Sequence, residues 1–284
     1  MKPLFAATAT MAVMAASPAL ADNHGEKPAS MMADHRVHHA LMAAANADNR
    51  AEDKARDKHR HPVETLMFFE VEPDMKVGEY APGGGWYSRM LGNYLGEEGR
   101  LVGLYFDPAA GPFNEQAQKG IRDSAAGFAA KTAGQVGKPV ANFGGLTLDA
   151  IPDAEKGTYD RILLVRMLHN MWRWNTADSE IAAMRELLAD DGLLGIVQHR
   201  AKADAPWSYA NGTKGYLRQQ DVIDWMRTQG FELVGLSEIN ANPMDTADHP
   251  EGVWEMPPVQ RTGRVDLVDK GESDRMTLLF RKAD

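Results

Sequence analysis

The chain alternates short apolar runs with longer stretches whose apolar residues recur every three or four positions. The apolar runs predict strands at 76–80, 100–105, 161–165, 193–199, 231–239 and 275–282. The three-to-four-residue period predicts helices at 62–69, 86–95, 114–130, 177–189 and 218–230. Strands that alternate with helices predict a mostly parallel α/β sheet with helices on both faces.

The first 21 residues follow a different pattern. Lys2 precedes a small apolar stretch at 4–16, and Ala19-Leu20-Ala21 fits the cleavage site of a signal peptide. The stretch is too short to span a membrane, so we expect no stable membrane insertion. This pattern predicts an exported chain that begins at Asp22, in a bacterial periplasm.

Residues 22–55 are polar, alanine-rich and predicted to be helical in part, and the α/β domain is expected at 56–284. His35, His38 and His39 share one helix face, where they could bind a divalent metal or simply face solvent. No carboxylate or cysteine spacing completes a metal site, so we expect no metal here.

The composition and net charge of the chain exclude some classes of protein. The chain has no cysteine, so its core must hold it together without disulfides. A formal net charge of −9 argues against general nucleic-acid binding, which requires clustered Lys and Arg. We therefore expect a small-molecule partner. The sequence does not indicate an oligomeric state.

A glycine loop follows the strand at 76–80. Gly83, Gly84 and Gly85 lie between this strand and the next predicted helix, where open α/β sheets bind ligands. Glycine allows a ligand to approach the backbone closely. Ser88 stands where a G-x-G-x-x-G motif has its third glycine, so the loop alone is compatible with a purely structural turn.

The stretch "VGEYAPGGGWYS" resembles the first motif of class I S-adenosylmethionine-dependent methyltransferases, an acidic residue followed by Gly-x-Gly-x-Gly. Glu79 takes the acidic place, Gly83 and Gly85 two glycine places, and Ala81 the first glycine place. Further stretches, including "RDKHRHPVETLMFF", "LLVRMLHNMWRW" and "GYLRQQDVI", look like exported, predicted methyltransferases of proteobacteria. This resemblance covers residues 56–282.

The resemblance implies a Rossmann-like, seven-stranded sheet with one antiparallel edge strand. It also implies that S-adenosylmethionine binds over 79–85, with Gly84 part of that surface. Such enzymes commonly bind the ribose with a carboxylate at the end of the second strand. Tyr105 occupies that place here, and the nearest acid is Asp107, which could bind the ribose or belong only to a loop.

Polar residues also follow the strand at 161–165. His169 is a candidate general base because its ordinary pKa lies near neutral pH, and Asn170 could orient an acceptor. Arg166 and Trp172 could contact the substrate, Trp172 by stacking. The alternative is that His169 caps a helix and Trp172 belongs to the core.

Two more candidates end the strand at 193–199. His199 and Arg200 could bind a carboxylate or phosphate of the acceptor, or Arg200 could form a salt bridge with an acid of the chain. Tyr216 is the preferred polar aromatic residue on the acceptor side. The late acidic loop at 237–258 has no spacing diagnostic of a metal site.

Three functions remain open. The first is a methyltransferase with an unknown, small-molecule acceptor, which needs positioning more than a conspicuous catalytic set. The second is an exported small-molecule-binding protein that keeps the methyltransferase fold without catalysis. The third is a metal-dependent hydrolase using His169, His199 and the late acidic loop.

Overall fold

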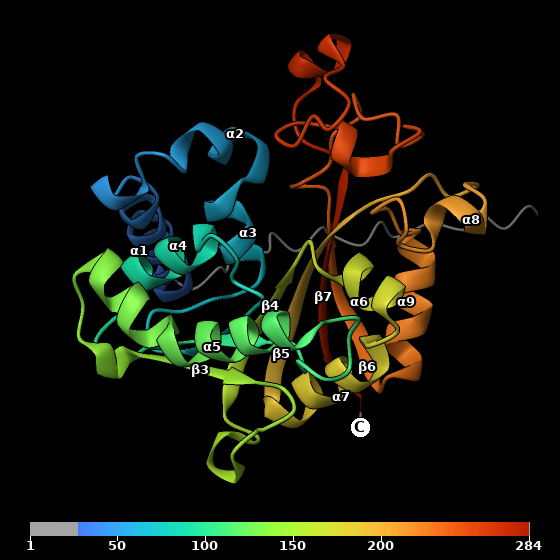
Figure 1. Ribbon diagram of the computed structural model, residues 1–284. Coiled ribbons are helices and arrows are strands. Elements are labelled where there is room, and N and C mark those ends of the chain that lie inside the picture. Colours follow the sequence, from blue (N-terminus) through green and yellow to red (C-terminus); the bar gives the residue numbers. More distant parts are fainter. Residues whose placement is uncertain (1–27, 284) are drawn as a thin grey trace, which may run out of the picture.

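The computed structural model describes residues 28–283 (Figure 1). The predicted signal peptide at 1–21 lies outside the described residues. Within the described part, no helix is both long and apolar enough to cross a membrane.

In residues 28–283, seven strands form one sheet in the order β3-β2-β1-β4-β5-β7-β6. The strands are β1 (Lys76–Tyr80), β2 (Arg100–Tyr105), β3 (Phe143–Thr147), β4 (Tyr159–Val165), β5 (Leu188–His199), β6 (Phe231–Ser237) and β7 (Arg275–Lys282). β3-β2-β1-β4-β5 pair in parallel, and β7 runs antiparallel to both β5 and β6. This confirms the predicted fold class, with the antiparallel strand next to the outermost strand β6.

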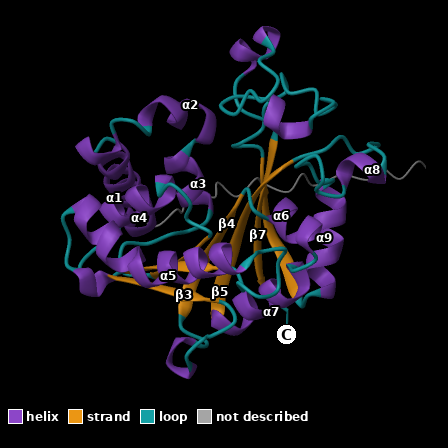
Figure 2. Ribbon diagram, viewed as in Figure 1, coloured by secondary structure: helices purple, strands orange, loops and turns teal. Residues whose placement is uncertain are grey.

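Helices cover both faces of the sheet (Figure 2). They are α1 (Pro28–Ala45), α2 (Asp57–Arg60), α3 (Pro62–Phe68), α4 (Trp86–Tyr94), α5 (Glu115–Val136), α6 (Leu168–Trp174), α7 (Ala177–Leu187), α8 (Trp207–Ala210) and α9 (Gln219–Thr228). Local signals set several ends. Pro62 is the first residue of α3, and the Asn114 side chain accepts a hydrogen bond from the Ala117 N–H at the start of α5.

The core consists of two layers, one on each face of the sheet. Ile162 and Leu164 of β4 pack in the layer with α7 and α9, and Leu163 between them packs in the layer with α3 and α4. Successive side chains of a strand point to opposite faces, so a strand buried on both sides is apolar throughout. This explains why the apolar run of β4 predicted a buried strand, whereas β1 is also buried but carries Glu79 among its inner residues.

The sequence pattern did not predict β3. Its sequence, Phe-Gly-Gly-Leu-Thr, has too few apolar residues for a buried strand. A Cβ on Gly145 would lie 2.1 Å from the Ala125 carbonyl oxygen, so glycine lets α5 pack directly on the strand. The same helix extends to Val136, beyond its expected end at residue 130.

The segment before residue 56 packs on the rest of the chain. Leu41 of α1 is fully buried in the layer with α3 and α4, and Asp53 bonds Arg89 of α4. His35, His38 and His39 are exposed. The domain boundary at residue 56 stays a prediction.

Candidate active site

A cavity of about 580 Å³ opens at the carboxyl ends of β1, β4 and β5. Its walls come from the glycine loop, the residues that follow β4, the N-terminal segment at 52–60 and the segment between β6 and β7. In Figure 1, this last segment, orange to red, projects past the strand ends near the blue N-terminal helices. Segments far apart in the sequence therefore enclose one space.

The glycine loop forms one wall with an unusual backbone. Ala81, Gly83 and Gly85 have φ angles of 49°, 56° and 79°. Ala81 thus adopts a left-handed conformation, which suits the glycine that the methyltransferase motif has at this place. In alanine this conformation is strained, because the Cβ lies too close to the backbone. A Cβ added to Gly84 would meet no atom within 4 Å, so the loop is open above this residue.

Glu79 is the second-last residue of β1, just before this loop, and it lines the cavity. Its carboxyl is buried and accepts a hydrogen bond from the Ser88 hydroxyl at 2.6 Å. Burial raises the pKa of Glu79 to about 8, although Ser88 and Arg89 oppose this. At neutral pH the group is therefore largely protonated and can both donate and accept hydrogen bonds.

Asp107 does not reach the cavity. Its Oδ1 accepts hydrogen bonds from the N–H groups of Ala109 (2.7 Å) and Ala110 (3.2 Å), which form a turn after β2. Phe106 beside it stacks on Phe113, with ring centroids 5.0 Å apart. The structure thus gives Asp107 a loop role, and its contact with a ribose stays a prediction.

His169 lines the cavity from the start of α6 and is buried. The Gln198 amide nitrogen donates to two carbonyls, so its oxygen is left to accept from His169 Nδ1 at 3.2 Å. This places the imidazole proton on Nδ1 and leaves Nε2 as an acceptor. Burial lowers the pKa of His169 to about 4, so the ring is neutral at neutral pH.

Three more predicted residues line the same cavity: Asn170, Arg166 and His199. The His199 ring lies 5.3 Å from the His169 ring, and its Nδ1 is 2.6 Å from the Ser273 hydroxyl. Burial and the neighbouring His169 lower the pKa of His199 well below its ordinary value. The two histidines thus offer neutral, polar groups.

Other predicted residues lie away from the cavity. Trp172 packs against Trp225 and Trp207, which agrees with the alternative that it belongs to the core. Arg200 is bound by Asp274 and Glu238, so the salt-bridge alternative describes it. Tyr216 is fully buried and donates to Asp245 Oδ2 at 2.9 Å. Gly85 precedes α4 and is not in the cavity wall.

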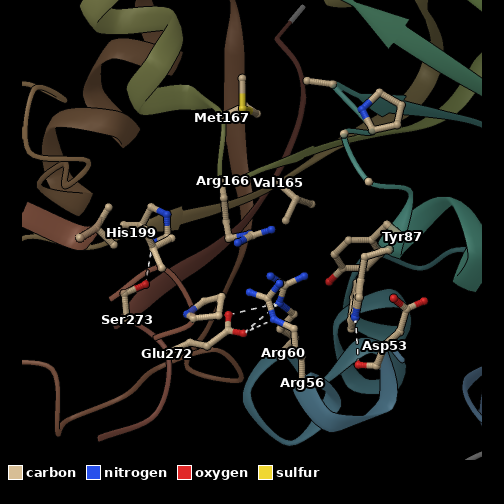
Figure 3. Close-up of a pocket in the computed structure, with 18 of the residues that line it drawn as sticks. Asp53, Arg56, Arg60, Tyr87, Val165, Arg166, Met167, His199, Glu272 and Ser273 are labelled. Carbon is tan, nitrogen blue, oxygen red and sulfur yellow. Dashed lines mark hydrogen bonds and ion pairs between the residues drawn. The ribbon is translucent and has the colours of Figure 1, made fainter. Parts of the chain in front are cut away.

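Two arginines of the cavity wall were not predicted from the sequence. Arg56 and Arg60 line the cavity, and both contact Glu272, more than 200 residues later in the chain (Figure 3). Both arginines lie in the stretch "RDKHRHP", which supported the resemblance without suggesting a role for them. The cluster of basic residues just before a predicted helix is the feature of the sequence that could have indicated a role for these two arginines.

Neither the histidine cluster nor the acidic loop forms a metal site in the described part of the chain. Within residues 28–283, no three His, Cys, Asp or Glu side chains are grouped so that they could hold a metal ion. His249 instead bonds Asp245 at 2.9 Å.

No family model matches the chain, and no curated protein matches it significantly. Solved structures do resemble it. The chain is similar to the MccD protein, with 11% identity, a TM-score of 0.50, and coverage of 78% of this chain and 98% of that chain. At this identity, the likeness is one of fold.

Two methyltransferases are among the other similar structures. One is a S-adenosylmethionine-dependent methyltransferase from Aquifex aeolicus, with 16% identity, a TM-score of 0.47, and coverage of 69% of this chain and 94% of that chain. The other is the 1,6-didemethyltoxoflavin-N1-methyltransferase of Burkholderia thailandensis, whose structure contains S-adenosylhomocysteine. It has 14% identity, a TM-score of 0.47, and coverage of 95% of this chain and 94% of that chain.

Proposed function

We propose that the chain is an S-adenosylmethionine-dependent methyltransferase that acts on a small-molecule acceptor. The observation that carries this proposal is the glycine loop. It lies at the carboxyl end of the central strand β1, has left-handed residues at Ala81 and Gly83, and borders a cavity large enough for a cofactor and a small acceptor. The resemblance at residues 79–85 supports the same reading.

The residues of the loop fit the cofactor at one end. Gly84 leaves open space, and protonated Glu79 offers a donor and an acceptor beside it. Bound there, S-adenosylmethionine would supply an electrophilic methyl group. Asp107 does not line the cavity, so in this proposal binding depends mainly on Glu79 and the loop.

The acceptor side is assigned to residues that follow β4. In this proposal, His169 Nε2 accepts the proton that an acceptor loses on methylation. Because burial lowers the pKa of His169 to about 4, the ring is a weak base, and the methylated acceptor must be the stronger acid. Asn170 presents an amide to the same cavity and is assigned to orient the acceptor. In this proposal, alignment within the cavity contributes most of the rate.

Calorimetric titration of the purified chain with S-adenosylhomocysteine tests the proposal. Gly84→Val should lower the affinity at least about tenfold because the new side chain fills the open space over the loop. A Cβ at this position meets no atom within 4 Å, so the free energy of unfolding should change little. Gly127→Val is the matched control, since Gly127 lies on α5 away from the cavity and is equally unobstructed.

Two results would oppose the proposal. If the unaltered chain bound neither S-adenosylhomocysteine nor S-adenosylmethionine at millimolar concentration, a binding protein without methyltransferase activity would be the better description. If Gly84→Val bound the ligand as tightly as Gly127→Val, the cofactor site would be placed wrongly.

We also propose that the chain is exported to a periplasm, as a member of the proteobacterial group that it resembles. The signal-peptide pattern at 1–21 supports this. Fractionation of a bacterium that expresses the full chain should recover a shortened product beginning at Asp22 in the periplasm. Full-length protein confined to the cytoplasm would contradict it.

A further inference from the structure

We propose that the cavity contains an oxyanion-binding site formed by Arg60 and Arg166, with Arg56 beside them, and that the methyl acceptor carries a carboxylate or phosphate group bound there. The oxyanion site stands on its own geometry. Its assignment to the methyl acceptor rests on the proposed function.

Arg166 is the strongest indication. It follows β4 in the left-handed conformation, with φ 58°, and lines the cavity. Its Nε is buried without a partner, and its guanidinium makes no hydrogen bond or ion pair with the residues that the structure describes. A guanidinium has five N–H donors, and leaving them unpaired away from water is costly. A strained backbone that holds an unpaired cation at a cavity wall suits a ligand-binding residue.

Arg60 and Arg56 have unused donors next to it. Arg60 is almost fully buried and bonds Glu272 through Nε at 3.2 Å. Its guanidinium lies over the Trp86 ring, and its Nη2 has no hydrogen-bond partner among the described residues. Arg56 bonds Glu272 through Nε at 2.6 Å, and its Nη2 is likewise buried and unpaired within the described chain. In Figure 3, the guanidinium groups of Arg56, Arg60 and Arg166 gather in one region of the cavity.

The charges of this cluster do not balance. Glu272 also bonds Arg275 at 3.3 Å, so one carboxylate faces the positive charges of Arg56, Arg60, Arg166 and Arg275. The formal sum is four minus one, or +3. Asp53, another acid of the cavity wall, is already bound through both oxygens by Arg89.

The remaining acids of the wall do not restore the balance. Glu79 is largely protonated at neutral pH, and Glu52 is exposed to solvent. Burial and the repulsion of Arg60 and Arg275 lower the pKa of Arg166 to about 9. A ligand with two anionic oxygens would pair with the free donors and reduce this repulsion.

Another part of the cavity wall indicates the rest of the ligand. Val253, Trp254, Pro257 and Pro258 line the cavity, and Trp254 lies 6.1 Å from the neutral His169 ring. Apolar and aromatic surface favours a planar or apolar body. We therefore assign the acceptor to small organic anions with an aromatic or apolar body, of which benzoate and phenyl phosphate are simple probes.

Titration calorimetry of the full chain with benzoate and with phenyl phosphate, first without S-adenosylhomocysteine and then at its saturating concentration, tests this assignment. At least one probe should bind, and the stronger one identifies the anion. Benzamide, which has the same ring and no charge, should bind at least about tenfold more weakly. Inorganic phosphate shows how much affinity the anion supplies without the ring.

Two variants locate the site. Arg166→Gln should weaken the better probe at least about tenfold, and Arg166→Lys, which keeps the charge without the guanidinium fork, should fall between. Arg200→Gln is the matched control because Arg200 follows the neighbouring strand and lies outside the cavity. It should bind as the unaltered chain does, and circular dichroism should show that all three variants are folded.

The outcomes separate this proposal from the proposed function. If S-adenosylhomocysteine binds but neither anion binds even in its absence, or if Arg166→Gln and Arg166→Lys leave anion affinity unchanged, the oxyanion site is wrong. If the anions bind and S-adenosylhomocysteine does not, the site stands and the methyltransferase proposal fails. If S-adenosylhomocysteine displaces the anions, the arginines serve the cofactor and the acceptor assignment is overturned.

Discussion

Arg166 and Arg200 each follow a parallel strand, β4 and β5, at the same edge of the sheet, yet their surroundings are opposite. Arg200 bonds Asp274 at 2.8 Å and Glu238 at 2.7 Å, and these carboxylates raise its pKa. Arg166 has no such partner in the described chain, and burial lowers its pKa. The carboxylates nearby, rather than the strand end, decide which arginine remains available to a ligand.

The carboxylates that bind the arginines of these two regions also differ. Glu238 is more than half exposed and serves one arginine, whereas Glu272 is almost fully buried and contacts Arg56, Arg60 and Arg275. Removing a carboxylate shared by several buried cations costs far more than removing a surface partner, because it leaves buried charges without compensation. The cavity wall is therefore both the more strongly charged region and the more dependent on a single acid.

The largest effect is expected from Glu272→Gln, which removes that acid. Two buried guanidinium groups, of Arg60 and Arg275, and the half-buried one of Arg56 would lose their carboxylate, so the free energy of unfolding should fall by about 3–5 kcal/mol. Glu238→Gln, the matched change at Arg200, should cost about 0–1 kcal/mol. Urea denaturation at neutral pH measures both, and equal losses would remove the contrast between the two regions.

Lowering the pH tests the same carboxylate, because it protonates Glu272 without a substitution. Burial alone would raise the pKa of Glu272, but Arg60, Arg56 and Arg275 outweigh it and lower the pKa to about 2, from an ordinary 4.5. Its stabilisation is thus complete above pH 4.5 and is lost as pH falls toward 2, by about 3 kcal/mol. The difference in stability between the unaltered chain and Glu272→Gln should shrink over this range. A constant difference would show that Glu272 does not act through its charge.

The sequence predicted those parts of the site that directly follow a strand. Glu79, Arg166 and His199 reach the cavity because the carboxyl ends of neighbouring parallel strands meet at one edge. Arg60 and Glu272 are 212 residues apart in the chain. A short helix and a long irregular segment bring them together, and the hydrophobic periodicity of the sequence does not predict the course of that segment. The sequence could suggest that Arg200 forms a salt bridge, but it could not distinguish its surroundings from those of Arg166.

A smaller effect, of opposite sign at the two strand ends, is expected for the arginines themselves. Without ligand, Arg166→Gln should raise the free energy of unfolding by about 1 kcal/mol because it removes an unpaired, repelled cation. Arg200→Gln should lower it by about 1–2 kcal/mol because two carboxylates lose their partner. Urea denaturation of the two variants checks the signs, and a loss at Arg166 as large as at Arg200 would mean that Arg166 is already satisfied.

The smallest effect concerns the backbone, which is left-handed at Ala81 and at Arg166 on the cavity side. Ala81→Gly removes a Cβ strained by roughly 1–2 kcal/mol and costs about 0.5–1 kcal/mol in chain entropy, so stability should rise by less than about 1 kcal/mol. Ala126→Gly, on the exposed surface of α5, should instead lose about 1 kcal/mol. If thermal unfolding showed the same loss for both, Ala81 would not be strained, and stored backbone strain would no longer distinguish the cavity edge from an ordinary surface.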